Sequence, residues 1–442
     1  MKPSGFLSNS AWLIFERVFV SLIALAVLPI VARYLGPSDF GLLSYALSLG
    51  TLFAIAGHLG LDGLIVRELV SKEQEPAVIL GTVFRMKLVA YWLAAAALAL
   101  YAFAAAPTGS NEFWLIICAA AFVAVAPFSL LKNWFHALVR AKFVVWSVVI
   151  SALISAASKL LMVAYGVSVI FIGAMTAAEA ALVAVILYLF YRKQEGLPLS
   201  DWKFSGATAK RLLSESWMVF AGSIFATIYL RIDQVMLRWI SGADEVGTYA
   251  VAAKLSEVTY FVPAAIVASL FPGLIKLRKD DEGEFRNRLQ AVFDLLAFMG
   301  LGVLVASLIV GPWAISLLFG EAYTPSISVF LIQVFALPFI FMRYAFSRWI
   351  LIEKLARFSL ITQGAGALIN VGLNLVLIPQ FGGIGAGYAT VFSYAAASFA
   401  MLLFSSKTRP LFFMMTRALV MPWRGAAQCL AIAFNRREAL HV

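Results

Sequence analysis

Charged residues are scarce in this sequence. Only 13% of its 442 residues are Asp, Glu, Lys or Arg, whereas 62% are hydrophobic. Water-soluble globular chains average roughly 25% charged residues, which cover the surface that faces water. The shortage excludes a cytosolic enzyme, a secreted domain and a disordered chain, and it predicts a protein that spans a membrane several times.

Cysteine and histidine are also rare. The two cysteines, Cys118 and Cys429, exclude a disulfide scaffold and form no CxxC pair. The three histidines, His58, His136 and His441, lie too far apart in the sequence to form an obvious ligand cluster. We therefore expect no metal site and no cofactor.

Long apolar runs occupy most of the chain. A helix needs about 20 predominantly apolar residues to cross a hydrocarbon layer roughly 30 Å thick. Twelve such stretches occur, near 10–33, 40–64, 83–105, 113–135, 143–164, 168–191, 214–239, 246–274, 289–311, 326–350, 357–378 and 384–404. Six precede the polar stretch 192–213 and six follow it. We predict an all-α polytopic membrane protein with two six-helix lobes, residues 1–196 and 197–405.

The basic residues predict the orientation of the chain. Most of the 34 lysines and arginines fall on one side of the membrane when the spans are counted from the N-terminus. Because such residues accumulate in cytoplasmic loops, both termini are expected in the cytoplasm. The net charge of +11 thus indicates topology rather than nucleic-acid binding. Residues 406–442 form the predicted cytoplasmic tail, in which 411–434 is amphipathic and is expected to lie on the membrane.

The connections predicted on the outer side are short. Even the longest, Pro312–Pro325, leaves no room for an external catalytic domain. No cleavable signal is expected, because Glu16 and Arg17 interrupt the apolar core of the first span. A membrane enzyme such as a ligase or polymerase is therefore disfavoured, and the function is expected to reside among the helices.

A short motif occurs twice, 206 residues apart. Gly36-Pro-Ser-Asp-Phe-Gly41 in the first outer loop matches Gly242-Ala-Asp-Glu-Val-Gly247 in the fourth, and each leads into an apolar helix. The equal sidedness predicts parallel halves related by a pseudo-two-fold axis along the membrane normal, as in some transporters. Alternatively, glycine and acidic residues simply suit any tight turn before a helix. The shared six-helix count favours the repeat, and with it an alternating-access transporter.

Three stretches of the chain resemble the polysaccharide and oligosaccharide flippases, the Wzx type of the MOP superfamily. They are Arg33-Tyr-Leu-Gly-Pro-Ser-Asp-Phe-Gly41, Arg231-Ile-Asp-Gln-Val-Met-Leu237 with the following Glu245-Val-Gly-Thr-Tyr-Ala250, and Gly383-Ile-Gly-Ala-Gly-Tyr-Ala-Thr390. The similarity covers most of residues 5–405. The resemblance implies a MATE-like fold, with two six-helix lobes around a central cavity.

The same resemblance implies a substrate. Family members move an undecaprenyl-pyrophosphate-linked oligosaccharide from the inner to the outer leaflet of the bacterial cytoplasmic membrane, for O-antigen, capsule or exopolysaccharide synthesis. Basic side chains of the cavity hold the pyrophosphate, and the lipid tail stays in the bilayer. Other polysaccharide-assembly proteins are further expected partners, and a monomer is expected because one chain holds both halves.

Five cations lie deep inside the predicted spans, at least five residues from either end. An ionisable residue at the centre of a membrane helix costs roughly 2.5–3.5 kcal/mol, so each requires a partner or a function. We interpret them as cavity groups for the pyrophosphate, since arginine binds phosphate in a bidentate manner and lysine acts as a movable charge. These residues are Arg17, Arg231, Lys254, Lys159 and Arg343. The competing interpretation is internal pairing, as of Lys254 with Glu257, or snorkelling of Lys159.

Acidic residues occur in the same spans. Asp233, Glu179, Glu257 and Glu16 are candidates for a coupling cation or proton site, or for salt bridges between helices. The closest alternative function is a cation-coupled exporter of drugs or other small molecules, which has the same architecture. That alternative predicts a cavity dominated by acids, and transport that depends on Asp233 or Glu179.

Overall fold

The computed structural model describes residues 3–194 and 196–426, and this part of the chain is entirely helical apart from short connections. The long helices are α1 (Pro3–His58), α3 (Pro76–Ala105), α4 (Asn111–Val125), α6 (Ala141–Ala164), α7 (Val169–Lys193), α8 (Gly206–Ile240), α9 (Ala243–Val258), α10 (Phe261–Asp280), α11 (Glu282–Phe319), α13 (Leu337–Ile352) and α14 (Ala356–Ser398). Shorter helices are α2 (Asp62–Ser71), α5 (Leu130–Ala137), α12 (Pro325–Gln333) and α15 (Arg409–Val420). The prediction of an all-α membrane protein is confirmed.

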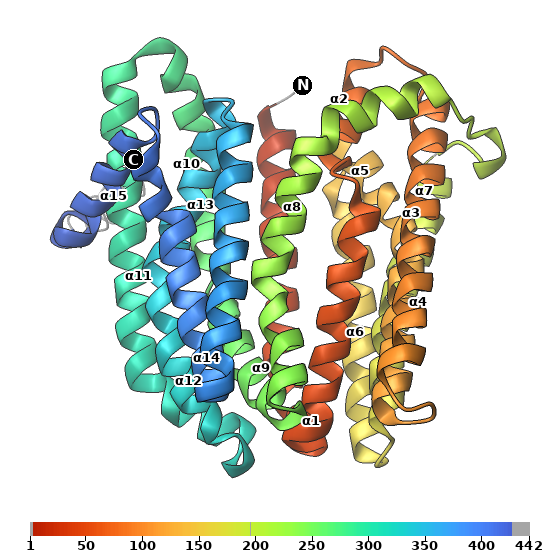
Figure 1. The fold of residues 1–442 in the computed structure, drawn as a ribbon. Helices are drawn as coiled ribbons and strands as arrows, with labels where there is room; N and C mark the ends of the chain where they lie inside the picture. Colours follow the sequence, from red (N-terminus) through yellow and green to blue (C-terminus); the bar gives the residue numbers. More distant parts are fainter. Residues whose placement is uncertain (1–2, 195, 427–442) are drawn as a thin grey trace, which may run out of the picture. The chain divides into compact units, whose positions relative to one another are not determined.

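Ten helical stretches of the described residues are long and apolar enough to cross a membrane. One stretch, Ala11–Ser71, includes most of α1, and another, Ala356–Phe404, includes α14. Each of these two stretches covers two of the predicted spans. Gly36 in α1 and Gly382 in α14 adopt φ angles of 68° and 54°, outside the helical region, and they divide each long helix into two. Figure 1 shows α1 reversing its direction at this break. The ten stretches are therefore compatible with the twelve predicted spans.

The break at Gly382 provides a test of this division. Only glycine adopts a φ of 54° with a ψ of −133° without steric strain, so Gly382→Ala should lower the free energy of unfolding by about 1–3 kcal/mol. Gly372 lies in the same helix, and a Cβ there would meet open space. Gly372→Ala should leave thermal unfolding in detergent unchanged or raise its midpoint. Equal midpoints for the two variants would contradict the strained break.

The chain forms two compact units, Met1–Ala250 and Val251–Val442. Unit 1 contains α1 to α8 and the beginning of α9, and unit 2 contains the remaining helices. This division follows from packing, whereas the predicted lobes 1–196 and 197–405 and the tail 406–442 follow from the number of spans. Those lobe and tail boundaries stay a prediction.

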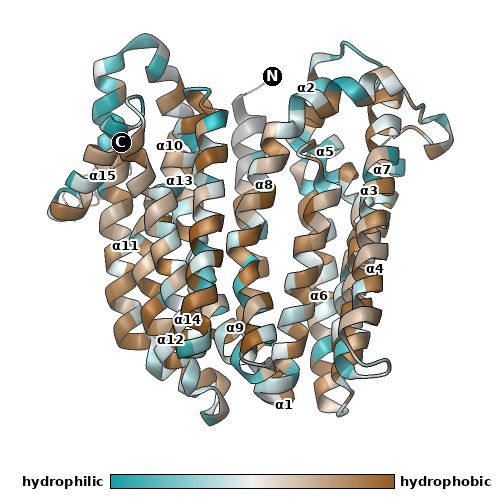
Figure 2. Cartoon of the chain, viewed as in Figure 1, coloured by the Kyte–Doolittle hydropathy of each residue, from teal (hydrophilic) through white to brown (hydrophobic). Residues whose placement is uncertain are grey.

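Hydrophobic residues extend along the helices of each unit, and hydrophilic residues gather toward the helix ends (Figure 2). Large apolar side chains such as Leu100, Ile309 and Leu368 are exposed within long helices. Exposed apolar surface of this extent is unfavourable in water but suits contact with lipid tails. The helices thus have the surface of a multi-pass membrane protein.

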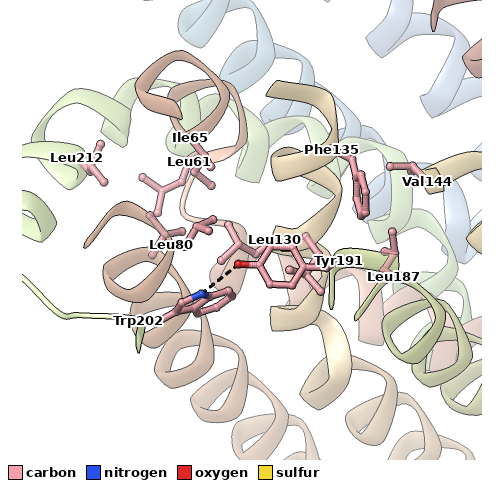
Figure 3. Close-up of a cluster of buried hydrophobic side chains, with 12 residues drawn as sticks. Leu61, Ile65, Leu80, Leu130, Phe135, Val144, Leu187, Tyr191, Trp202 and Leu212 are labelled. Carbon is pink, nitrogen blue, oxygen red and sulfur yellow. Dashed lines mark hydrogen bonds between the residues drawn. The ribbon is translucent and has the colours of Figure 1, made fainter. Parts of the chain in front are cut away.

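A buried cluster fixes the segment that follows α7 to the rest of unit 1 (Figure 3). Trp202 packs among aliphatic side chains of α2, α3 and α5, and its indole N–H donates to the Tyr191 hydroxyl at 3.3 Å. The backbone of Lys203 lies directly against Gly81 of α3, where no side chain would fit. This packing stabilises the end of unit 1 at which a polar cluster is found.

Candidate functional site in the membrane-embedded helices

Four polar side chains of unit 1 converge at the predicted inner ends of its helices, and we call them the polar cluster. Lys87 of α3 is only 1% exposed, and its Nζ lies 2.6 Å from Oδ1 of Asp62. The side-chain amide of Asn133 donates to the same oxygen at 2.8 Å, and His58 Nε2 lies 3.0 Å from Oδ2. Asp62 is thus the common partner of three side chains from α1, α3 and α5.

The local sequence places these groups together. The α-helix stops at His58 because Leu59 and Gly60 adopt left-handed φ angles of 52° and 65°, and α2 then begins at Asp62. Gly60 is required here, because a Cβ would lie 2.7 Å from the backbone nitrogen of Phe220 in α8. This tight turn brings His58 and Asp62 beside the side chain of Lys87.

Further charges surround the polar cluster. Lys132 of α5 lies within electrostatic range of both Asp62 and Glu16, and Arg17 interacts with Glu16 in the same way. Lys87, Lys132 and Arg17 therefore outnumber the two acids by one charge. The Asp62 side chain is 39% exposed, so the buried lysine is neutralised by an accessible carboxylate. The arrangement can attract an anionic group.

Two of the predicted cations form ion pairs inside the protein. Lys159 Nζ lies 3.4 Å from Oε2 of Glu179, which also accepts a hydrogen bond of 2.6 Å from the Ser155 hydroxyl. Lys254 Nζ lies 3.6 Å from Oε2 of Glu257, one turn further along α9. Internal pairing, the competing interpretation, therefore describes these two lysines, and a role of either in substrate binding stays a prediction.

The other predicted cations differ in their surroundings. Arg17 is exposed on α1, and within the described part of the chain it makes no hydrogen bond or ion pair at contact distance. Arg343 in unit 2 is held by Gln363 Oε1 at 2.6 Å and by the Ser398 hydroxyl at 3.1 Å. Arg231 is half-buried on α8. Arg17 is thus the most accessible of the candidate groups for an anion.

Asp233 is a buried acid of unit 1. It is 3% exposed, and its Oδ2 accepts a hydrogen bond of 2.6 Å from the Tyr249 hydroxyl, which joins α8 to α9. This contact is structural, and a coupling role for Asp233 stays a prediction. Among residues 3–194 and 196–426, no group of three His, Cys, Asp or Glu side chains has the arrangement of a metal site.

The two repeated hairpins contact each other within unit 1. A Cβ on Gly41 would collide with the carbonyl oxygen of Ala243, and a Cβ on Gly247 would collide with the carbonyl oxygen of Pro37. Because Pro37 and Ala243 are themselves separated by the repeat of 206 residues, the two contacts are equivalent. A two-fold axis produces such reciprocity, and chance turn chemistry does not. The contact therefore supports the repeat and its predicted axis.

Polar bonds strengthen the predicted outer end of unit 1. The Arg238 guanidinium of α8 lies 2.6 Å from Oε2 of Glu112 in α4. The Ser48 hydroxyl donates to Gln234 Oε1 at 2.7 Å, in the interior. The Trp239 indole N–H lies 3.2 Å from the hydroxyl of Tyr45. These bonds tie α8 to α1 and α4 around the glycine contact.

The polar cluster was not among the candidates taken from the sequence. Lys87 and Lys132 count as basic residues of the predicted cytoplasmic side, although they lie inside the predicted spans 83–105 and 113–135. Their position inside apolar runs is the signal that could have identified them. Asp62, the shared partner of Lys87 and Asn133, comes from α2, and no pattern of spacing in the sequence connects it with α3 and α5.

The architecture corresponds to that of known transporters. The lipid II flippase MurJ in an inward closed conformation superposes with a TM-score of 0.72, 13% identity, and coverage of 99% of this chain and 100% of that chain. The MATE multidrug transporter DinF-BH superposes with a TM-score of 0.68, 14% identity, and coverage of 93% of this chain and 97% of that chain. The fold is therefore MurJ- and MATE-like, which confirms the MATE-like fold that the family resemblance implied.

Sequence comparison then assigns the family. Residues 6–278 match the family described as polysaccharide biosynthesis protein. A putative O-antigen transporter of Shigella flexneri is 22% identical over 396 residues, which are 86% of this chain and 93% of the relative. A probable flippase of Haloferax volcanii, AglR, is 29% identical over 186 residues, 38% of this chain and 36% of the relative. The chain belongs to the polysaccharide biosynthesis protein family, and its resemblance to Wzx-type flippases is confirmed.

Proposed function

We propose that this protein is a flippase for an undecaprenyl-pyrophosphate-linked oligosaccharide. It moves this substrate by alternating access from the inner to the outer leaflet of the bacterial cytoplasmic membrane, for O-antigen, capsule or exopolysaccharide synthesis. The observation that carries the proposal is the similarity to a putative O-antigen transporter over 93% of that relative's length. The protein acts as a transporter rather than an enzyme, as a monomer with both termini in the cytoplasm.

The pyrophosphate is the part of the substrate that needs the protein most. Moving an unpaired anion through hydrocarbon costs tens of kcal/mol in the idealised limit. Arg17, exposed beside a group of charges with a positive excess, provides a guanidinium that can bind the pyrophosphate in a bidentate manner. Lys132 lies near the same helix and extends the positive charge. Arg231 and Arg343, with Lys159 and Lys254 in ion pairs, are the further candidates.

The membrane potential supplies part of the driving force. Each charge that crosses 100 mV changes its energy by about 2.3 kcal/mol. A dianionic pyrophosphate that leaves a negative cytoplasm therefore gains about 4–5 kcal/mol.

Replacement of Arg17 tests the site. Arg17→Ala should decrease the rate at which glycan reaches the cell surface by about 10- to 100-fold, because a charge-assisted hydrogen bond contributes about 1.5–3 kcal/mol. Arg17→Lys should retain part of the activity, since the charge remains but the bidentate geometry is lost. Surface glycan is measured with a specific lectin or antibody in cells whose own copy has been removed.

The matched control is Arg192→Ala. Arg192 is also an exposed arginine of unit 1, at the end of α7, and its loss should leave surface glycan unchanged. Membrane abundance of each variant is measured in the same cells. Normal surface glycan with Arg17→Ala, at normal abundance, would reject the assigned site. Normal glycan in cells without the protein, together with lost drug efflux, would favour the exporter instead.

A further inference from the structure

A cavity lies in unit 2, far in sequence from the first hairpin. It has a volume of about 310 Å³ and lies between α10, α11, α13 and the short helix α15. Apolar side chains form one part of its lining, including Phe285, Leu289 and Met414, and charged side chains form the other. Such a combination suits a ligand that is itself apolar at one end and charged at the other.

Five charged side chains line this cavity, and four of them, Arg278, Glu282, Arg286 and Glu353, are joined in ion pairs. Arg278 Nε lies 2.7 Å from Oε1 of Glu353, which raises the pKa of Arg278, and Arg286 lies 2.7 Å from Oε1 of Glu282. Lys407 also lines the cavity, is exposed, and forms no ion pair with any residue that the structure describes. The cavity therefore favours an anionic ligand at Lys407.

Helix α15 packs firmly against the other helices of unit 2, so the wall that it contributes to the cavity is fixed. Leu411, Met415 and Ala418 follow a helical spacing and are buried against unit 2. The side-chain amide of Gln290 in α11 donates to the Met414 carbonyl at 3.1 Å. Arg424, just after α15, lies 3.0 Å from Oδ2 of the fully buried Asp294. These contacts fix the wall that carries Met414, and Lys407 lies just before the start of α15.

The outward face of α15 and its flanking residues combines exposed apolar groups with cations. Phe413, Trp423 and Phe404 are exposed, the last at 79%. Lys407 and Arg409 lie between Phe404 and Phe413 in the sequence and are also exposed. Exposed aromatic and basic residues on one amphipathic segment are typical of a helix in the interface between lipid and water. The mouth of the cavity is then at the level of lipid headgroups.

We propose that this cavity binds the headgroup region of an anionic membrane phospholipid. Lys407 holds the phosphate, and the side chains of Leu289 and Met414 contact the first part of an acyl chain. A cavity of about 310 Å³ accommodates this part of a lipid rather than the whole molecule. The proposal is independent of the proposed function, because the bound lipid is a resident of the membrane and not the cargo.

Binding is tested on the purified full-length protein in a neutral detergent by native mass spectrometry. Phosphatidylglycerol should bind more strongly than phosphatidylcholine with the same acyl chains. Lys407→Gln should weaken phosphatidylglycerol binding about fivefold, the effect expected for one basic residue near an anionic lipid. The matched control, Lys210→Gln, removes an exposed lysine of α8 that does not line the cavity, and it should have no effect.

A second variant distinguishes the cavity from general surface attraction. Leu289→Trp fills the apolar part, so it should abolish the preference for phosphatidylglycerol while Lys407 remains; Met414→Trp replaces it if the first variant does not fold. Equal binding of the two lipids, or equal effects of Lys407→Gln and Lys210→Gln, would overturn the proposal. Stronger binding of glycerol phosphate or of a polyprenyl pyrophosphate than of phosphatidylglycerol would also overturn it, because the ligand would then be a free phosphate or the cargo.

Discussion

Replacement of Gly41 by alanine should lower the free energy of unfolding by about 1–3 kcal/mol, the usual penalty for inserting a methyl group into a filled space. The added Cβ would collide with the Ala243 carbonyl, and it would approach the Gly247 backbone nitrogen to 2.9 Å. Backbone atoms cannot rotate away as a side chain does, so the hairpins themselves would have to separate. Thermal unfolding of the purified variant in detergent measures the loss.

The repeat makes this prediction symmetric. Gly247→Ala should have an effect similar to that of Gly41→Ala, because its Cβ would collide with the Pro37 carbonyl in the equivalent contact. Gly222→Ala is the matched control, since a Cβ at that position of α8 would meet nothing within 4 Å. It should be neutral or slightly stabilising. If Gly41→Ala melts at the temperature of the control, the hairpins are not in backbone contact.

Transport should fall with stability in the two hairpin variants. A contact that exists in only one state of an alternating-access cycle changes the ratio of the states by its own free energy. A change of about 1–3 kcal/mol corresponds to roughly 5- to 150-fold in that ratio. The surface-glycan assay reports this effect, and unchanged transport in variants that melt at a lower temperature would show that the contact does not take part in the cycle.

Asp62→Asn should be the most destabilising neutralisation in unit 1. It leaves the ammonium group of Lys87, which is 1% exposed, without its anionic partner, and breaking a buried pair in this way costs about 3–5 kcal/mol. Lys87→Met should cost less, because the Asp62 side chain is 39% exposed and can be hydrated once the lysine is gone. Melting temperatures of the two single variants give this order.

The double variant separates charge pairing from side-chain packing. Asp62→Asn with Lys87→Met removes both charges, so it should recover most of the stability that Asp62→Asn loses. Glu179→Gln is the comparison, since its partner Lys159 is partly exposed and the pair is longer, at 3.4 Å. Its effect should be about 0–1 kcal/mol. A double variant as unstable as Asp62→Asn alone would show that the ion pair is not the source of the effect.

The membrane spans and the hairpins could be predicted because their signals are local. Apolar runs of sufficient length give helices, and Gly36 marks the first reversal in the chain. The repeat of Gly41 at Gly247 also predicts that the two halves are related, and the mutual contact of these glycines agrees with it. In all these cases a few neighbouring residues contain the whole signal.

The candidate site was predicted less well, because it depends on which side chains face each other. The sequence indicated that Arg17, Lys159 and Lys254 lie inside spans, and it offered the pair of Lys254 with Glu257 as an alternative, but it did not indicate the pair of Lys159 with Glu179. Lys87 was misjudged in the other direction. Because it lies near a basic loop in the sequence, its side chain was expected in water, whereas the structure buries it. Its burial depends on Asp62, 25 residues earlier, and on the turn that orients that acid.

The central claim is that this protein carries a lipid-linked glycan across the membrane, and leaflet-specific labelling tests it most directly. Labelled undecaprenyl-pyrophosphate oligosaccharide is followed by its accessibility to an external probe in cells depleted of the protein. The account predicts that the substrate builds up in the inner leaflet, and that wild type restores its outward movement but Arg17→Ala does not. A normal distribution between the leaflets after depletion would contradict the proposed function.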